Sequence, residues 1–320
     1  MARNTMEAWL REEQDSQVIR RLNQTSAAET RYRSIPMSGN VKTEPRMVDM
    51  DVAVIAKGAA YGEDEGINDE VTLTARKFGR ALRIAEEDVD DNIANVLEAK
   101  KVGWVTSFGI ALDNATIGTT AAANGTTVPF TSIYRTIVNP SAEDIAIGYA
   151  ANDNYLETTG ALTYDDLSDL ASLVEGGTYH ADSTAAFMAH PRVKGIIRKI
   201  QDGDGNYIFT ASPRAGDPDT LFGYPIVWTN GAVTSATATS SALVASTPGA
   251  KGTAGNALIV FANTDFLLLG KRSGPESVVI DGRDGLSALT DETLLKVRAR
   301  RAFAVAHPRA VAVLEITAGA

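Results

Sequence analysis

The segment from Val41 to Ile117 constrains the fold of this chain more than any other part of its sequence. Its first part, which runs to about Asp69, mixes valine, isoleucine, methionine and alanine with Pro45 and three glycines. This composition predicts an extended arm that is too thin to bury an interior of its own. Because an isolated two-stranded arm is only marginally stable in water, we expect the arm to lie on a neighbour. A neighbour in turn implies assembly.

A long amphipathic helix is expected after the arm, over residues 86–117. Acidic residues crowd its first turns, where the positive end of the helix dipole favours negative charge, and no proline interrupts it. Apolar residues then recur at offsets of about three and four, which is typical of a helix with one apolar face. The residues of this face are Val89, Ile93, Val96, Leu97, Trp104, Val105, Phe108 and Leu112. We expect Ile93, Leu97, Trp104 and Phe108 to form its core.

Charge and composition exclude several classes of protein. The chain has 320 residues, of which 44% are apolar, carries a formal net charge of −10 and contains no cysteine. An acidic chain lacks the basic footprint of a nucleic-acid-binding protein, and disulfides and cysteine-ligated metals are ruled out. No apolar run approaches the roughly 20 residues that span a bilayer, and no signal peptide is visible. We therefore expect a soluble protein made in a cytoplasm.

The first 35 residues are polar and mix arginines with acidic residues. Two interpretations remain open for them. They form either a mobile terminus or an arm that becomes ordered on a partner.

Alternating apolar residues predict strands near both ends of the chain. Residues 71–73 and 82–84 alternate in this way, and residues 295–305 give the clearest strand, because cationic residues alternate there with apolar ones. A turn at residues 307–308 is expected to lead into residues 311–313, which continue the sheet. The early strands flank the long helix, and strands from the end of the chain are needed to cover it. We therefore expect an α+β fold whose first and last segments share one layer.

The middle of the chain is expected to be more compact. Thr163 with Asp166 forms a capping box that predicts the start of a helix, and Pro191 fits the start of another. Short strands are expected at residues 185–189, 207–209, 226–228, 258–261 and 266–269. Two segments rich in threonine, alanine and glycine, residues 118–132 and 231–255, predict loops, the second of them flexible.

No catalytic or metal-binding constellation stands out in the sequence. His180, His190 and His307 have no second histidine or cysteine at metal-ligand spacing. Residues 202–206 resemble the opening of a calcium loop, but the twelfth position holds Pro213 instead of a bidentate glutamate. We therefore expect no metal, no cofactor and no enzymatic activity.

The order of these segments resembles the major capsid protein of tailed bacteriophages, whose Hong Kong-type fold is shared with encapsulin shells. The sequence YGEDEGI at residues 61–67 resembles the return of that family's extended loop, and residues 82–91 with the following helix resemble its spine helix. Further motifs of the family follow in the same order, at residues 188–191, 202–207, 221–227, 263–270 and 304–316. The resemblance covers nearly everything after residue 35.

The resemblance implies a division of the chain into named parts. These are an N-terminal arm (1–37), an extended β-hairpin loop (38–75), a peripheral domain with the spine helix (76–139), an axial domain (140–255), the return strands of the peripheral domain (256–305) and a closing strand (306–320).

The resemblance also implies a shell-forming structural protein that is not an enzyme. Copies are expected to assemble into pentamers and hexamers and to close an icosahedral head shell around double-stranded DNA, without specific DNA contacts. No room is left for a scaffolding domain before Arg31, so we expect a separate scaffold protein, together with a portal and a cementing protein. The shell would belong to the virion and assemble in the host cytoplasm, with no membrane partner.

The extended loop is expected to reach over an adjacent subunit, where main-chain pairing and buried side chains replace water. The residues expected at this subunit interface are Arg46, Lys57, Tyr61, Glu63 and Glu65. One branch of the resembled family joins its subunits by an isopeptide bond from a loop lysine to an asparagine, with a glutamate taking up the proton. Counting back from His307, the matching positions hold Thr293 and Arg300. That bond is therefore not expected here.

Two other functions remain open from the sequence. An encapsulin-type nanocompartment shell would enclose a cargo enzyme and would need a groove for a cargo peptide, which the sequence does not reveal. An α+β enzyme with a lid loop belongs to a different class, and the lack of a catalytic constellation argues against it.

Overall fold

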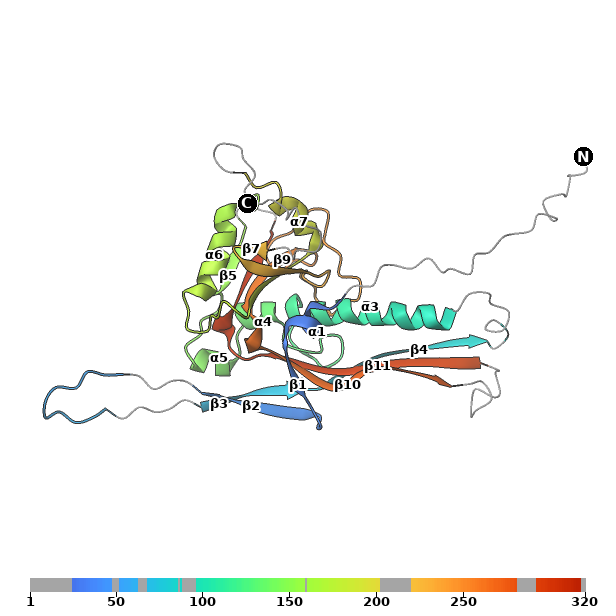
Figure 1. Ribbon diagram of the computed structural model, residues 1–320, viewed down its shortest axis with the longest axis horizontal. Coiled ribbons are helices and arrows are strands. Elements are labelled where there is room, and N and C mark those ends of the chain that lie inside the picture. The colour runs from blue at the N-terminus through green and yellow to red at the C-terminus, as the bar shows by residue number, and fades with distance from the viewer. Residues whose placement is uncertain are drawn as a thin grey trace, which may run out of the picture. The chain divides into compact units, whose positions relative to one another are not determined.

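Strands from the two ends of the chain meet in one four-stranded sheet in the computed structural model (Figure 1). The order of the sheet is β1-β10-β11-β4. Its strands are β1 (Arg33–Pro36), β4 (Arg76–Ala85), β10 (Leu267–Ile280) and β11 (Glu292–Val305). β1 runs parallel to β10, with Arg33 in register with Leu268. The α+β fold is confirmed, and the early strand β4 shares this sheet with the late strand β11.

The structure describes most of the chain. The described residues are 25–47, 52–62, 68–85, 87, 96–158, 160–201, 220–280 and 292–317. The chain divides into two units, one of Met1–Asn23, Gly79–Thr106 and Pro275–Arg298, the other of Gln24–Phe78, Ser107–Gly274 and Ala299–Ala320. The acidic stretch at 88–91, the turn at 202–206 and the strand expected at 207–209 lie outside the described residues.

β11 alternates buried and half-buried residues over most of its length, as its sequence predicts. The buried side holds Thr293, Leu295, Val297 and Ala299. Arg301 continues this buried side and is 2% exposed, although it is a cation. Its Nε donates a hydrogen bond to Glu29 Oε1 at 2.5 Å, and its Nη1 donates to the carbonyl of Ser273. Because buried charges are tolerated only when paired, this pairing explains how a cation occupies a core position.

A six-stranded sheet with the order β5-β12-β9-β6-β8-β7 forms the second layer of strands. Its strands are β5 (Tyr155–Glu157), β6 (Ala185–Ala189), β7 (Thr220–Leu221), β8 (Tyr224–Trp228), β9 (Leu258–Asn263) and β12 (Val311–Glu315). Helix α6 (Tyr164–Glu175) lies beside this sheet (Figure 1). It buries Leu167 and Leu170 in one core with Phe187 and Phe261 of the sheet. The helix begins at the predicted capping box. α7 (Pro191–Ile197) begins at the predicted proline.

Two strands belong to a different sheet from the one expected. β9 lies within the segment assigned to the peripheral return strands, 256–305, yet it pairs with β6 and β12 of the six-stranded sheet. β12 pairs with β9 and β5 and does not continue the sheet of β11. The cause is two single-turn 3-10 helices, η2 (Thr264–Phe266) and η4 (Pro308–Ala310), which redirect the chain. Each is capped by the residue before it, Asn263 or His307.

The helix after the arm is less one-sided than its sequence pattern indicates. The described helix α3 runs over Val96–Ile117. In its last two turns Leu112, Asn114 and Ile117 are all fully buried, whereas Val105, expected on the apolar face, is 48% exposed. Asn114 tolerates burial because its Nδ2 donates hydrogen bonds to the carbonyls of Gly231, at 3.1 Å, and Val233, at 2.8 Å. The expected single apolar face is therefore wrong for this part of the helix.

The segment 25–36 is part of the core and not a mobile terminus. Helix α1 (Ala27–Arg31) is followed directly by β1. Asp113 of α3 accepts hydrogen bonds from Ser26 Oγ at 2.5 Å and from the backbone N–H groups of Ala27 and Ala28 at 2.9 and 3.0 Å. A fourth bond comes from Thr229 Oγ1 at 2.5 Å. Residues 25–36 therefore fit neither interpretation, because they are ordered on their own chain and not on a partner, while residues 1–24 lie outside the described part.

The two predicted loops have no regular secondary structure over most of their length, but they are packed. In the segment 231–255, Val233, Thr234 and Ala242 are buried, so the expectation of a flexible loop is wrong there. The hydrogen bond from Thr234 N to the carbonyl of Asn256, 2.9 Å, helps to hold it. Two short helices after the first loop, α4 (Ile133–Val138) and α5 (Ala142–Ala146), were not predicted.

Candidate assembly site

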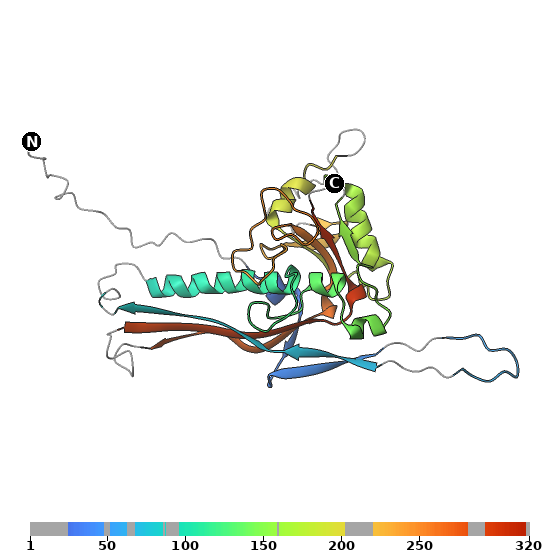
Figure 2. The same cartoon turned by 180° about the vertical axis from the view of Figure 1, so that it is seen from behind.

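An arm of two strands carries the most exposed part of the described chain. β2 (Val41–Met47) and β3 (Asn68–Thr74) form an antiparallel pair, with Val41 opposite Thr74 (Figure 2). Between them, residues 52–62 have neither helix nor strand, and every one of them is exposed. The predicted extended arm is therefore present in the described residues.

Large apolar side chains of the arm lie in solvent. Val54 is 101% exposed, Val52 90%, Tyr61 86% and Met47 73%. Fully burying a side chain of this kind stabilises a structure by about 1.5–3 kcal/mol. Because clustered exposed apolar residues mark interaction sites, the arm offers a surface that a partner can bury.

The base of the arm, in contrast, is packed into the chain. Val71 and Leu73 of β3 are buried in one core with Ile35, Leu268 and Ala302. The last three belong to β1, β10 and β11 of the four-stranded sheet. An exposed arm thus grows from a base that is fixed by apolar packing.

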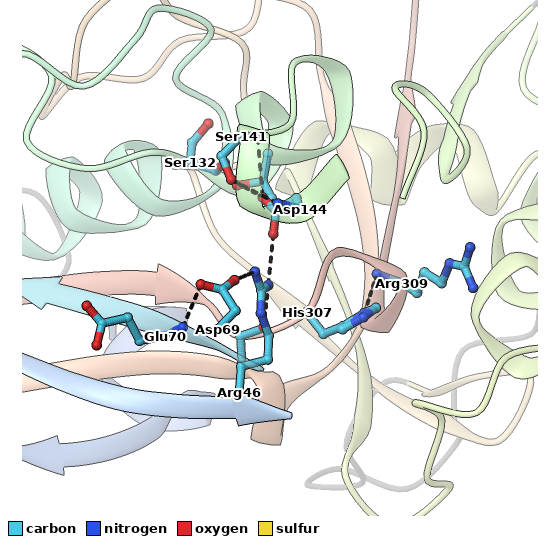
Figure 3. A network of polar contacts seen from close by, with 10 residues as sticks. Arg46, Asp69, Glu70, Ser132, Ser141, Asp144, His307 and Arg309 are labelled. Carbon is cyan, nitrogen blue, oxygen red and sulfur yellow. Dashed lines mark hydrogen bonds and ion pairs between the residues drawn. The ribbon is translucent and has the colours of Figure 1, made fainter. Parts of the chain in front are cut away.

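A buried arginine adds a polar anchor to this base (Figure 3). Arg46 of β2 stands opposite Asp69 of β3, and its Nη2 forms an ion pair with the Asp69 carboxylate. Its Nη1 donates hydrogen bonds to Asp144 Oδ1 at 2.8 Å and to the carbonyl of Ala306 at 3.0 Å. The Arg46 side chain is only 10% exposed. One side chain therefore joins both strands of the arm to α5 and to the segment that follows β11.

Asp144 is itself held in place at the start of α5 (Figure 3). Its backbone N–H donates to Ser141 Oγ at 3.2 Å, and its Oδ2 accepts a hydrogen bond from the backbone N–H of Ser141 at 3.4 Å. This reciprocal arrangement is a capping box. Asp144 thus offers one carboxylate oxygen to its own helix and the other to Arg46.

The contacts between Arg46 and its partners stabilise the charged forms of Arg46 and Asp69. Burial alone would lower the pKa of Arg46, but the hydrogen bonds to Asp144 and Asp69 outweigh it and raise that pKa. The hydrogen bond from Arg46 in turn lowers the pKa of Asp69 below its ordinary value of 3.8. Arg46 and Asp69 are therefore both charged at neutral pH.

His307 lies next to this anchor and is neutral. Burial, with the nearby charges of Arg46 and Arg309, lowers its pKa from 6.5 to about 4. Its ring stacks on Tyr179 with ring centres 3.7 Å apart, and its Nδ1 accepts a hydrogen bond from the backbone N–H of Arg309 at 3.2 Å. These contacts give His307 a structural role.

Two kinds of element are absent from the described residues, a cluster of metal ligands and a membrane-spanning helix. No group of three or more histidine, cysteine, aspartate or glutamate residues in the described part could hold a metal ion. Among the described helices, none is long and apolar enough to cross a membrane. What distinguishes the chain is an exposed apolar arm on a rigid base. That arrangement suits assembly.

Comparison with known proteins identifies the family. The model of the phage capsid family matches residues 8–316, which is nearly the whole chain. The chain belongs to the phage capsid family. Its function is accordingly that of a major capsid protein, a structural subunit of a phage shell.

Solved structures of the same fold support this placement. A chain from the capsid of a native GTA particle, computed with C5 symmetry, has 20% sequence identity and a TM-score of 0.69, with 99% of this chain and 100% of that chain covered. A chain of Mycobacterium phage Ogopogo has 16% identity and a TM-score of 0.72, with 99% and 100% covered. A chain of Mycobacterium phage Bobi has 14% identity and a TM-score of 0.71, with 99% of each covered. No curated protein matches the chain in sequence.

The predicted interface residues fall into two groups in this capsid fold. Lys57 and Tyr61 are exposed on the arm, and Lys57 precedes Gly58, whose φ of 85° makes a tight turn. Arg46 is buried at the base of the arm and pairs within its own chain. Glu63 and Glu65 lie outside the described residues.

The predicted core of the spine helix is also only partly brought together. Phe108 is 5% exposed and meets Phe78 of β4 edge to face, with ring centres 5.3 Å apart. Leu97 and Trp104 are half-buried. Ile93 lies outside the described residues. Phe108 is therefore the member of the set that is buried in the described structure.

Sequence reasoning missed Asp69 and Asp144, the partners of Arg46. A signal existed for each of them. Arg46 and Asp69 carry opposite charges on two segments predicted to be extended, and opposite charges favour cross-strand pairing. Ser141 followed three residues later by Asp144 is the pattern of a capping box. No sequence pattern connects Arg46 with Asp144, which lies 98 residues further along the chain.

Proposed function

We propose that this protein is the major subunit of the icosahedral head shell of a tailed phage, assembled from pentamers and hexamers around double-stranded DNA. The observation that carries the proposal is the arm of residues 41–74, whose tip exposes Val52, Val54 and Tyr61 while its base is buried. A lone subunit gains nothing from such an arm. A subunit that lies against another copy can bury it.

The arm would act by lying on an adjacent subunit. There its backbone groups can pair and its apolar side chains can leave water. Lys57 and Tyr61 are proposed as direct contacts, together with Glu63 and Glu65. Arg46 is proposed to support the interface indirectly, because its pairing with Asp69 and Asp144 fixes the direction in which the arm leaves the subunit. Each contact is modest, but repetition around a ring makes the assembly cooperative.

The other parts of the shell are proposed from the same architecture. The four-stranded sheet with α3 would form the peripheral domain, and the six-stranded sheet would form the axial domain, which then includes β9. A separate scaffold protein, a portal and a cementing protein are the expected partners. The net charge of −10 disfavours specific contacts with the packaged DNA. The shell would belong to the virion, after assembly in the host cytoplasm.

The alternatives have less support. The match to the phage capsid family favours a phage shell over an encapsulin-type compartment. An enzyme with a lid loop would need reactive groups beneath the arm. The base of the arm instead consists of paired charges and apolar packing.

Electron microscopy of the purified protein tests the proposal, with closed shells expected. Val54→Ser with Tyr61→Ser should leave a folded subunit that does not assemble, because the substitutions remove apolar area only from the arm. Leu243→Ser is the matched control, because Leu243 is 81% exposed but lies outside the arm. Failure of the wild-type protein to form particles would contradict the proposed function. Normal shells from the double variant would contradict the role of the arm.

A further inference from the structure

A polar pocket lies beside the base of the arm. Its volume is about 620 Å³, and it is lined by β3, the start of β4, part of the 123–131 loop, α5 and the end of β11. Six charged residues line it, namely Arg46, Asp69, Glu70, Arg76, Glu143 and Asp144. Arg46 is already neutralised by Asp69 and Asp144. Arg76 is therefore the cation through which the pocket can bind a ligand.

Arg76 is a half-buried cation without an anion. No hydrogen bond or ion pair joins its side chain to any other residue in the described part of the chain, and its Nε is buried without a partner. Buried donors are nearly always satisfied in native proteins. Arg46 and Arg301, which are also buried, are each paired with a carboxylate. Among these three arginines, Arg76 is the one that the described part of the chain leaves without a carboxylate.

The guanidinium of Arg76 lies close to the backbone of a loop. It lies against Gly125, where an added Cβ would come within 2.8 Å of Arg76 Nη1 and 2.9 Å of Cζ. The φ of Gly125 is 77°, a conformation that side chains other than glycine rarely adopt. Glycine thus lets the loop approach the guanidinium closely.

We propose that Arg76 binds a carboxylate side chain of a second copy of this chain, which enters the pocket during assembly. This inference rests on the proposed self-assembly. A guanidinium forms its strongest hydrogen bonds with planar oxyanions, of which a carboxylate is one. A neighbouring copy is the partner that assembly always supplies, and with 40 acidic residues against 30 lysines and arginines it offers a surplus of carboxylates.

A DNA phosphate is the competing anion, and the pocket disfavours it. Glu70 and Glu143 are exposed residues of its wall. They repel a duplex, which carries one charge for about every 1.7 Å of its axis. A single carboxylate on a protein segment can place its charge on Arg76 and keep the rest of the segment away from the two glutamates. The occupant is therefore assigned as protein.

Charge removal gives the first test. Arg76→Met keeps most of the side-chain volume but cannot bind a carboxylate. We expect the concentration of subunit needed for half-maximal assembly to rise roughly ten-fold, the effect of one charge-assisted contact, and to become less sensitive to salt. Lys77→Met is the matched control, because Lys77 is the exposed cation next along β4. Equal assembly and equal salt dependence of the two variants would overturn the proposal.

A second test uses the wild-type chain, so that it does not depend on whether a variant folds. Phenylglyoxal modifies accessible arginines, and mass spectrometry locates the modified residues in free subunits and in shells. Arg76 should react in free subunits and be protected in shells assembled without DNA. Equal reactivity in both, or protection that appears only when DNA is present, would overturn the assignment to a second copy. If the wild-type chain forms no shells, the proposed function fails instead, which keeps the two failures distinct.

Discussion

Arg46 lies directly opposite Asp69 in the antiparallel pair of β2 and β3, and the same guanidinium reaches Asp144 at the start of α5. The two carboxylates come from elements that are far apart in the sequence. The ion pair across the strands fixes the register of the arm. The contact with Asp144 fixes the arm to the body of its unit. An arm anchored in this way can present its exposed tip in a defined direction.

Removal of this anchor should destabilise the subunit. Arg46→Met leaves the carboxylates of Asp69 and Asp144 without their cation, and the Asp144 side chain is only 12% exposed. We expect the free energy of unfolding to fall by about 2–4 kcal/mol, as for other buried ion pairs that lose one partner. Urea unfolding followed by circular dichroism measures the change.

Lys42→Met on the same strand is the control for that variant. Lys42 pairs with Glu44, but the two side chains are 40% and 31% exposed, and exposed pairs contribute about 0–1 kcal/mol. The unfolding curve of this control should almost coincide with that of the wild type. Similar losses of unfolding free energy in the two variants would show that burial does not increase the contribution of Arg46 to stability.

The sequence predicts those elements whose pattern is local. The period of two in β11, the capping box at Thr163 and the proline at the start of α7 each reflect an interaction within a few residues, and all three are confirmed. The pairing of β9 and β12 within the six-stranded sheet could not be predicted in this way. Two short 3-10 turns decide it, and apolar runs of the same length fit either sheet.

Buried polar residues are the other limit of prediction from this sequence. Asp113, Asn114 and Thr116 look like the solvent face of α3, yet all three are buried. Their partners lie in segments that no spacing rule connects to the helix, such as Ser26 and the carbonyl of Val233. A hydrophobic pattern therefore identified the helix but not which of its sides would be covered.

Asp113 should be essential for holding the segment before β1. Its two oxygens accept four hydrogen bonds, from Ser26, Ala27, Ala28 and Thr229. Asp113→Asn replaces one acceptor with an N–H₂ group that faces donors, which should cost about 2–4 kcal/mol of stability. Limited proteolysis should then cut between residues 25 and 36 faster than in the wild type. The exposed substitution Asp169→Asn on α6 should change neither measurement, and the same result for both variants would refute the role of Asp113.

Two buried histidines should make the subunit sensitive to acid. Burial lowers the pKa of His190 and of His307 from 6.5 to about 4. Between these values the unfolded chain binds protons that the folded chain does not. Stability therefore falls as the pH decreases from 6.5 to 4, by on the order of 1–3 kcal/mol for each residue. Urea unfolding at pH 7 and pH 5 measures the slope.

His307→Asn separates titration from structure in that experiment. The asparagine side chain can still accept the hydrogen bond from the backbone N–H of Arg309, but it does not titrate near neutral pH. The variant should lose less stability than the wild type between pH 7 and pH 5. An unchanged loss would mean that His307 does not contribute to the acid sensitivity.

Two aromatic residues of α3 should differ in how much they contribute to the stability of the subunit. Phe108 is 5% exposed, touches Phe78 and lies beneath Arg301, whose Cζ is 5.7 Å from the ring centre. Phe108→Ala should therefore cost about 3–5 kcal/mol. Trp104 is half-buried, so Trp104→Ala should cost only about 1–2 kcal/mol. Thermal melting compares the two, and the reverse order would show that the burial of these side chains does not set their contribution.

Mature shells of this protein should be held together without covalent bonds between subunits. An isopeptide bond between a lysine and an asparagine needs a carboxamide to attack and a base to take up the proton. At the matching positions of β11, Thr293 is buried and has no carboxamide, and Arg300 is a permanent cation that cannot act as a base. Lys57 is exposed on the arm but has neither partner at these positions.

Boiling in detergent followed by gel electrophoresis checks this prediction. Non-covalent contacts dissociate under these conditions, so a single band near 33.9 kDa is expected. Lys57→Met shells should give the same band, since no bond depends on that lysine. If the wild type instead gave a ladder of larger bands and Lys57→Met abolished it, Lys57 would form a bond to an acceptor other than Thr293. A ladder that persisted in the variant would place the cross-link on another lysine. Either ladder would contradict a shell that depends only on buried apolar area, hydrogen bonds and ion pairs.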